Sequence, residues 1–211
     1  MPTSNYKAIS LLLDAVNALR PSSVLDIGVR MGKYGVLCRE YLDELWIGGL
    51  RSRIDGIEAF EKYLTPVHSY VYDKIYIGDA LEVLPKMERR YEPALLIDVF
   101  EHFDRAEGAK LLHLCNRVAE SILMSVPAGW SSQDALHGNT YEIHRAGYSW
   151  RDLRSLGFSQ CWRINGGSYI ALKSSKKVSL RRTILRLAVA GLLPLPLGDP
   201  AAVVARWLGL I

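Results

Sequence analysis

The sequence predicts an α/β fold built on a doubly wound, mainly parallel sheet of seven strands that ends in an antiparallel hairpin. Short apolar runs alternate with segments of helical periodicity, which is typical of parallel strands joined by right-handed crossovers. Gly and acidic residues directly follow these runs, at the sheet edge where such folds bind ligands. Two final strand-like segments flank an Asn-Gly-Gly turn, which favours a hairpin.

The first half of the chain predicts three strands separated by helices. Apolar residues at helical spacing predict a helix at 5–19, which stops before Pro21. The predicted elements that follow are a strand at 24–27, a helix at 33–45, a strand at 53–57, a helix at 62–69, a strand at 74–77 and a short helix at 81–87. This alternation is the pattern of parallel strands with helical crossovers.

The second half predicts the middle and the far edge of the sheet. The fully apolar run at 94–98 is typical of a strand in the interior of a sheet. The elements after it are a helix at 105–119, a strand at 121–126, a helix at 149–156 with Ser149 as its N-cap, and strands at 158–164 and 168–173 around Asn165-Gly166-Gly167. The stretch at 127–148 is long and irregular, and connections of that length usually carry function.

Composition indicates one domain with a basic extension. A chain of 211 residues, 49% of them apolar, is long enough for one well-buried domain, which we assign to residues 1–174. From Lys173 onward there are seven Lys and Arg residues against the single acid Asp199, so the preceding part carries about −2 of the net charge of +4. Residues 175–211 are therefore predicted to be a basic and apolar C-terminal helical extension.

The cysteines and the N-terminal residues indicate a reducing, cytosolic compartment. Cys38, Cys115 and Cys161 are odd in number, far apart and not in a Cys-x-x-Cys pair, so they indicate neither a disulfide framework nor a zinc site. We therefore expect no bound metal. The first residues lack a basic segment followed by an apolar one, so we expect no secretory signal.

The first chemical motif lies in the turn after the first strand. Gly28 and Gly32 leave backbone amides open at the start of a helix, where negative charge is favoured. A dinucleotide site needs Gly-x-Gly-x-x-Gly, but these positions hold Gly28, Arg30 and Lys33. An acid followed by Gly-x-Gly-x-Gly fits better, because Asp26, Gly28 and Gly32 match it. Only the middle glycine is replaced, by Arg30.

This turn resembles motif I of class I S-adenosylmethionine (SAM) dependent methyltransferases, and the resemblance extends over residues 24–173. It implies a Rossmann-like fold, SAM as cofactor and a small-molecule acceptor, as in the small-molecule methyltransferases of types 11 and 12. It also implies cofactor contacts from Asp26, Gly28 and Gly32. The Arg30 guanidinium then faces solvent or meets the carboxylate of the methionine moiety.

Acidic residues at later strand ends match further parts of the family pattern. Glu58, after the second strand, is expected to accept both ribose hydroxyls, since a carboxylate offers two acceptors to two donors. The resemblance places Asp79, with Ala80 beside it, near the adenine amine, although Asp79 also suits the N-cap of the next helix. Asp98, at the end of the fourth strand, is expected near the sulfonium, whose charge it would stabilise.

Asp98 also opens a segment that resembles the Asp-x-x-Glu-His of many small-molecule methyltransferases. Its Glu101 and His102 either take part in catalysis or hold the turn as a hydrogen-bonding pair. Both interpretations stay open, because methyl transfer from a sulfonium mainly needs alignment and, for some acceptors, a base.

The irregular loop at 127–148 is the candidate acceptor side. His137 and His144 are candidate general bases, since imidazole titrates near neutral pH. Asn139 and Glu142 are candidates for binding acceptor hydroxyls. Three aromatic residues near the loop either line an apolar or sugar-stacking pocket or serve packing: Trp130, Tyr141 and Trp150.

The C-terminal extension combines basic and apolar residues and contains two prolines, Pro194 and Pro196. Its apolar run falls short of the roughly 20 residues that span a bilayer. It therefore suits a peripheral membrane contact with anionic lipid, or packing on its own domain or on a second copy. Nucleic acid is a weaker candidate, because stacking aromatic residues are not interleaved with the basic ones.

Three functions are compatible with these patterns. The favoured one is SAM-dependent methyl transfer to an oxygen of a sugar or other metabolite, where the oxygen nucleophile rests on family analogy alone. The second is a regulatory protein that binds SAM without turnover, since Arg30 interrupts the glycine pattern. The third is a nicotinamide dehydrogenase, which the glycine spacing disfavours.

Overall fold

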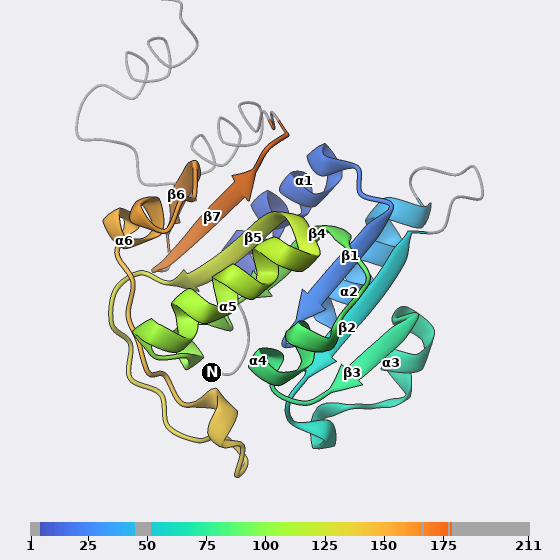
Figure 1. Cartoon of the computed structure of the whole chain (residues 1–211), viewed down its shortest axis with the longest axis horizontal. Coiled ribbons are helices and arrows are strands. Elements are labelled where there is room, and N and C mark those ends of the chain that lie inside the picture. Colours follow the sequence, from blue (N-terminus) through green and yellow to red (C-terminus); the bar gives the residue numbers. More distant parts are fainter. Residues whose placement is uncertain (1–4, 45–51, 166, 177, 179–211) are drawn as a thin grey trace, which may run out of the picture.

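A seven-stranded sheet forms the centre of the computed structural model, which describes residues 5–44, 52–165, 167–176 and 178. The strand order is β3-β2-β1-β4-β5-β7-β6, and β7 runs antiparallel to its two neighbours. The strands are β1 (Ser23–Ile27), β2 (Arg53–Glu58), β3 (Lys74–Ile77), β4 (Tyr91–Ile97), β5 (Ala119–Pro127), β6 (Gln160–Ile164) and β7 (Ser168–Ser174). The predicted mainly parallel sheet with a C-terminal antiparallel hairpin is confirmed (Figure 1).

Helices cover both faces of this sheet (Figure 1). One apolar cluster includes residues of α1 (Ile9–Leu19), α2 (Lys33–Cys38) and α3 (Pro66–Val71), and the other includes residues of α4 (Ala80–Val83), α5 (Arg105–Val118) and α6 (Trp150–Ser155). Shorter helical turns are η1 (Tyr6–Ala8), η2 (Arg39–Glu44), η3 (Glu61–Tyr63), η4 (Leu84–Lys86), η5 (Phe100–His102) and η6 (Thr140–Glu142). The central strands are therefore buried on both faces, as their continuous apolar runs predicted.

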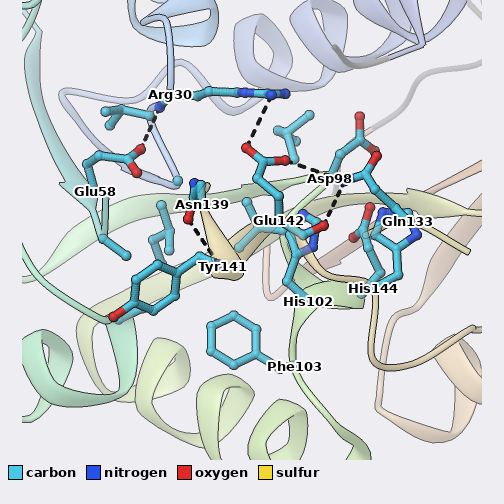
Figure 2. A pocket seen from close by; sticks show the side chains of 18 of the residues that line it. Arg30, Glu58, Asp98, His102, Phe103, Gln133, Asn139, Tyr141, Glu142 and His144 are labelled. Atoms are coloured by element: carbon cyan, nitrogen blue, oxygen red, sulfur yellow. Dashed lines mark hydrogen bonds and ion pairs between the residues drawn. The ribbon is translucent and has the colours of Figure 1, made fainter. Parts of the chain in front are cut away.

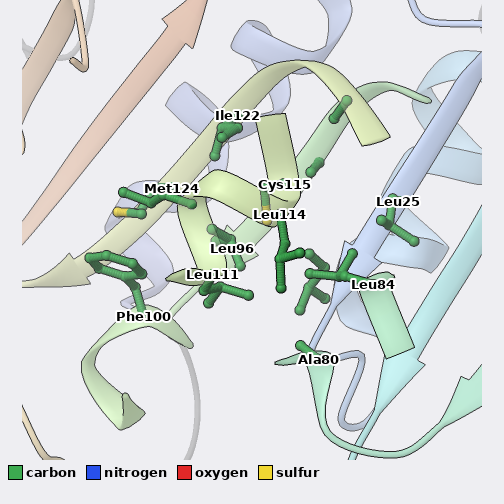
Figure 3. Packing of buried hydrophobic residues seen from close by; sticks show 14 of the residues in the cluster. Leu25, Ala80, Leu84, Leu96, Phe100, Leu111, Leu114, Cys115, Ile122 and Met124 are labelled. Atoms are coloured by element: carbon green, nitrogen blue, oxygen red, sulfur yellow. The ribbon is translucent and has the colours of Figure 1, made fainter. Parts of the chain in front are cut away.

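α5 is packed tightly against the sheet, and this fixes the segment before it (Figure 3). Leu111 and Cys115 are fully buried in one cluster with Leu25 of β1 and Leu96 of β4. The helix begins at a capping box, because the side chain of Asp104 accepts the backbone N–H groups of residues 106 and 107, each at 2.8 Å. The start of α5 thus holds η5 at the carboxyl end of β4.

Two predicted helices are divided where a proline interrupts them. Pro66 has no N–H to continue the helix predicted at 62–69, so that segment forms η3 and then α3. Pro85 has the same effect on the helix predicted at 81–87, which forms α4 and then η4. The strand predicted at 94–98 begins earlier, at Tyr91, and ends at Ile97.

The helix predicted at 33–45 ends early and continues as the π-helical turn η2. Arg39 at its start reaches out of the helix, because its guanidinium lies 2.6 Å from Asp73 and its Nε donates to the Val71 carbonyl at 2.7 Å. It also bonds Asp43 within η2 at 3.0 Å. β6 begins at Gln160, two residues later than predicted, after a left-handed Gly157 with φ of 91°.

The start of the C-terminal extension lies on the domain. Lys176 Nζ is 3.2 Å from Glu92, and the Val178 carbonyl accepts a hydrogen bond from Gln160 Nε2 at 3.1 Å. Gly166 of the hairpin turn, residue 177 and residues 179–211 lie outside the described residues, so the helix, membrane contact or self-association expected there stay predictions. Within the described part, no helix combines the length and apolar character needed to cross a bilayer.

Candidate functional site

A cavity of about 740 Å³ opens at the carboxyl ends of β1 to β5, within the size range of about 300–1,000 Å³ for small-molecule sites. Most predicted site residues line it: Gly28, Arg30, Glu58, Asp79, Ala80, Asp98, Glu101, His102, Asn139, Glu142 and His144. Three others lie outside its lining: Asp26, Gly32 and His137. The fold therefore gathers these residues from five separate segments of the chain at one edge of the sheet.

The turn after β1 is shaped by three left-handed residues. Gly28 and Gly32 have φ of 79°, and Arg30 between them has φ of 51°. The Gly28 N–H donates to the Ile57 carbonyl at 2.8 Å, which ties the turn to the end of β2. Arg30 thus adopts the left-handed backbone that glycine tolerates best, at a cost of about 1–2 kcal/mol for a residue with a Cβ.

Gly28 is confined by a neighbouring side chain as well as by its backbone. A Cβ at this position would lie 2.5 Å from Cγ2 of Val99, which follows β4 and also lines the cavity. Packing between the β1 turn and the end of β4 therefore requires glycine at position 28, whether or not a ligand binds beside it. At Gly32 a Cβ would meet His68 Nε2 at an ordinary 3.5 Å, so there the backbone conformation alone favours glycine.

His68 of α3 supports this turn from the side. Its Nε2 donates to the Arg30 carbonyl at 2.8 Å, and its Nδ1 accepts the Thr65 N–H at 2.9 Å. A carbonyl can only accept, so Nε2 carries the proton and the ring is neutral. Sequence reasoning missed His68, because it lies 38 positions from Arg30 and no local pattern connects them.

Glu58 joins the turn to the end of β2 and lines the cavity (Figure 2). Its side chain is 5% exposed, and its two oxygens accept the Arg30 N–H and the Phe60 N–H, each at 2.8 Å. Each oxygen keeps lone-pair capacity for a ligand hydroxyl. Burial raises the pKa of Glu58, and the two backbone donors act against this shift.

The Arg30 guanidinium pairs with the loop after β5 (Figure 2). Its Nη2 lies 3.2 Å from Glu142 Oε1, and the group stacks over the Tyr63 ring at 5.4 Å from the centroid. The two alternatives expected for Arg30, solvent and a ligand carboxylate, did not include this protein partner. The Arg30 side chain is 25% exposed and the Glu142 side chain 9%, so solvent screens this ion pair only in part.

Asp26 lies beneath the turn, in the packing between β1 and α3. Its side chain is 3% exposed and accepts a hydrogen bond from the Tyr72 hydroxyl at 2.6 Å. Burial raises the pKa of Asp26 to about 6, against the lowering effect of the Tyr72 hydroxyl. Asp26 lies outside the cavity lining, and the cofactor contact expected of it stays a prediction.

Two other strand-end acids line the cavity. Asp79 caps α4, because its Oδ1 accepts the Leu81 N–H at 2.8 Å, so the capping interpretation is confirmed. Asp98 has a left-handed backbone with φ of 53°, and its Oδ1 accepts a hydrogen bond from the Ser125 hydroxyl at 2.7 Å. Both carboxyl groups make the cavity favourable for a positively charged ligand.

Glu101 and His102 lie on η5, beside His144 of the loop after β5. The Glu101 carbonyl accepts the N–H groups of Arg145 and Ala146 at 2.8 and 3.1 Å, which fastens this loop to η5. The imidazole centroids of His102 and His144 are 5.1 Å apart (Figure 2). The structure therefore brings together three of the four candidate catalytic residues.

Burial favours the neutral forms of Glu101 and His102. The pKa of Glu101 is raised well above its ordinary value, first by burial and then by the nearby Asp98 carboxylate. The pKa of His102 is lowered by burial, while its hydrogen bond to the Ile143 carbonyl acts in the opposite direction. A neutral imidazole accepts a proton, so His102 meets the chemical requirement for a base.

The other predicted loop residues divide between the cavity and the surface. Tyr141 lines the cavity, and the Asn139 side chain accepts its N–H at 3.0 Å, which shapes η6. His137 is an exposed turn residue with φ of 51°. Trp130 and Trp150 are 64% and 52% exposed and lie outside the lining, so neither a pocket role nor core packing fits them.

Several lining residues carried no signal in the sequence. They come from the N-terminal segment, the helix starts and the long loop: Asn5, Tyr6, Lys33, Tyr63, Phe103, Gln133 and Arg145. Burial lowers the pKa of Lys33, while the Asp98 carboxylate acts in the opposite direction. Only the tertiary structure places these residues at the sheet edge.

Comparisons with known proteins give matches among solved structures. No protein-family model and no curated protein sequence matches the chain. The N-terminal domain of EvdMO1, solved in the presence of SAH and D-fucose, has a TM-score of 0.59 at 14% identity, over 82% of this chain and 85% of that chain. The PH0226 protein from Pyrococcus horikoshii has a TM-score of 0.55 at 14% identity, over 83% and 96%.

A third structure is described as an O-methyltransferase family protein from Burkholderia thailandensis. Its TM-score is 0.53 at 12% identity, and the match covers 81% of this chain and 57% of that protein. This chain therefore spans a little over half of that protein's length. At such identities the likeness shows a shared fold and leaves the substrate to be argued from the site.

Proposed function

We propose that this chain, which has the fold of class I SAM-dependent methyltransferases, transfers a methyl group from SAM to an oxygen of a hydroxylated small molecule. One observation carries the proposal. The buried Glu58 carboxylate and the left-handed turn at Gly28 line the same cavity and are tied to each other through the Arg30 N–H. This combination suits a nucleoside whose sugar lies at the end of β2.

The polar groups of the cavity fit SAM. Glu58 offers two oxygens with remaining lone pairs to a pair of ribose hydroxyls. Asp79 has a second carboxylate oxygen beyond its capping bond for an adenine amine, and Ala80 beside it leaves room in the lining. Asp98 adds negative charge for a sulfonium. Three carboxyl groups in one cavity favour a cationic ligand over the anionic pyrophosphate of a dinucleotide.

When bound, SAM supplies a methyl group on a sulfonium that an acceptor oxygen displaces in line. The residues of the chain hold that acceptor and accept its proton. Nδ1 of His102 donates to the Ile143 carbonyl at 3.3 Å, and Nδ1 of His144 donates to the Ser131 carbonyl at 2.5 Å. This leaves Nε2 of each ring able to accept a proton at the cavity wall.

A sugar or similarly hydroxylated metabolite is the acceptor class that this lining favours. Gln133 and Glu142 provide amide and carboxylate groups that hydrogen-bond hydroxyls. Tyr141 is 46% exposed at the edge of the cavity, where its ring can stack on an apolar sugar face. The EvdMO1 domain was solved with a sugar, D-fucose, which supports the same class. We place this activity in the cytosol, in line with three free thiols.

Calorimetric titration of the full-length chain with SAM, SAH and NAD tests the cofactor. We expect SAM and SAH to bind and NAD to give no saturable heat. Glu58→Ala should weaken SAH binding at least about tenfold, because one hydrogen bond to a charged group contributes about 1.5–3 kcal/mol. Glu61→Ala, at an exposed neighbouring site, is the matched control and should bind like wild type. Saturable NAD binding without SAH binding would contradict the proposal.

Release of SAH from SAM, followed with a panel of hydroxylated sugars and phenols, tests turnover. We expect SAH to form with at least one acceptor. We expect SAH formation to be lost in a variant with weakened cofactor binding, such as Glu58→Ala. Tight SAH binding with no turnover on any acceptor of the panel would favour the regulatory alternative.

A further inference from the structure

Glu101, His102 and His144 form a compact set of metal-ligating side chains on the cavity wall. One carboxylate oxygen of Glu101 and one ring nitrogen of each histidine all lie within 4.8 Å of one another. Two of these residues lie on η5 and the third follows β5, so no spacing in the sequence indicated the set. Hydrogen bonds from the loop backbone to the Glu101 carbonyl hold the two segments together.

Both imidazoles make a hydrogen bond through Nδ1 to a backbone carbonyl. Nδ1 of His102 donates to the Ile143 carbonyl, and Nδ1 of His144 donates to the Ser131 carbonyl. A carbonyl has no proton to give, so Nδ1 carries the hydrogen and Nε2 keeps the free lone pair. Such bonds set the tautomer and the ring orientation of metal-ligating histidines.

The Glu101 carboxyl group is a second, independent indication. It is 2% exposed, and its Oε2 accepts no hydrogen bond from the described residues. A buried acceptor without a partner costs about 1–3 kcal/mol, and more if it is charged. Asp98 and Glu142 line the same cavity as Glu101, so three carboxyl groups share this region. A cation at this point would satisfy the oxygen and reduce the repulsion.

We propose that Glu101, His102 and His144 bind one divalent first-row transition-metal ion, of the class of Mn²⁺, Fe²⁺, Co²⁺ or Zn²⁺. Two imidazole nitrogens and one carboxylate suit these ions, whereas Mg²⁺ and Ca²⁺ prefer oxygen ligands. Bonds of about 2.0–2.2 Å keep any two ligand atoms of one ion within about 4.4 Å. Side-chain shifts of about half an ångström therefore close the present set around an ion.

The ion would keep free coordination positions facing the acceptor. Three protein ligands leave at least one position for an exogenous oxygen, and all three residues line the cavity that contains Glu58 and Asp98. Resting on the proposed function, we assign that position to the acceptor hydroxyl. A metal lowers the pKa of an oxygen that it binds, so the hydroxyl releases its proton to solvent more readily. With the ion bound, His102 and His144 serve as its ligands in place of their role as proton acceptors. The acceptor class then narrows to molecules whose hydroxyl oxygen can ligate a metal.

Metal titration of the full-length chain, stripped with a chelator and free of SAM, tests the inference. Free Mn²⁺ is followed by electron paramagnetic resonance, and Co²⁺ by its visible absorption. We expect one ion per chain. His144→Ala should weaken Mn²⁺ binding more than about 100-fold, because losing even a supporting partner of a ligand costs about 10–100-fold. His113→Ala, on the exposed face of α5, is the matched control and should bind like wild type.

Glu101→Gln is the second variant, since it keeps the shape of the side chain and removes its charge. We expect it to weaken Mn²⁺ binding as well, with circular dichroism showing that each variant is folded. Wild-type protein that binds neither Mn²⁺ nor Co²⁺ at millimolar concentration, or a folded His144→Ala that binds as wild type does, would overturn the inference. SAH titration of the same samples separates the two proposals. SAH binding without metal binding overturns the metal site alone, and metal binding without SAH binding overturns the cofactor assignment alone.

Discussion

Replacement of Gly28 tests two roles of this residue, its packing in the β1 turn and the room that it leaves for a ligand. In Gly28→Ala the new Cβ would lie 2.5 Å from Val99 Cγ2, on a backbone with φ of 79°. Overpacking of this kind costs about 1–3 kcal/mol, and a left-handed backbone costs a residue with a Cβ about 1–2 kcal/mol. We therefore expect the variant to lose about 2–5 kcal/mol of unfolding free energy in urea titrations.

Val99→Ala removes the methyl group that the new Cβ meets. The double variant should recover about 1–3 kcal/mol relative to the sum of the single variants, and should keep the backbone cost. Urea unfolding of the four proteins measures this coupling, and SAH calorimetry on the same proteins measures affinity. We expect stability to be recovered and SAH affinity to stay low, because the Cβ still occupies the cavity-lining turn. Coupling near zero would refute the packing argument, and normal SAH binding by Gly28→Ala would refute the ligand argument.

Three further predictions concern residues around this turn. Burial raises the pKa of Asp26 to about 6, so the native state keeps a proton that the unfolded chain releases near pH 4. The contribution of Asp26 to the unfolding free energy should therefore fall by about 3 kcal/mol as the pH rises from about 4 to about 6. Asp26→Asn should lack this fall, and parallel pH profiles of the two proteins in urea unfolding would contradict the assignment. Arg30→Gly keeps the N–H that Glu58 accepts and suits the φ of 51°, so calorimetry should show SAH affinity changed by less than about threefold. A loss beyond about tenfold would place the guanidinium on the ligand. Glu142→Gln removes the buried charged partner of Arg30 and should lower the unfolding free energy by about 1–3 kcal/mol, whereas an unchanged unfolding free energy would show that the pair does not hold the loop.

The fold could be predicted because its signals are local. Each strand is a short apolar run, and each crossover has its own helical period, so the mainly parallel strand direction and the closing hairpin followed from known connection rules. Pro66 and Pro85 show what a periodicity window overlooks, since a missing N–H divides a helix without changing its apolar pattern. The π-turn at Arg39 depends on Asp73, which is 34 residues away, so it had no local signal.

The cavity residues at strand ends were easier to predict than those of the long loop after β5. Glu58, Asp79 and Asp98 follow strand ends, and the topology alone brings those ends to one edge. Asp26 lies within β1, where successive side chains alternate between faces, and its carboxyl group meets Tyr72 in the packing beneath the turn.

The acceptor side depends on the path of one long loop. His137 and His144 look equivalent in the sequence, because both are histidines in the same polar loop. Backbone hydrogen bonds from residues 145 and 146 to the Glu101 carbonyl place His144 beside His102. His137 is left at an exposed turn. Such bonds leave no pattern in composition or spacing.

A crystal structure of the chain grown with SAH tests the central claim most directly. The account predicts the nucleoside across the carboxyl ends of β1 to β4, with its sugar hydroxyls on Glu58, its adenine beside Asp79 and its sulfur near Asp98. SAH found at another surface, or this cavity free of SAH in crystals grown at saturating concentration, would contradict it.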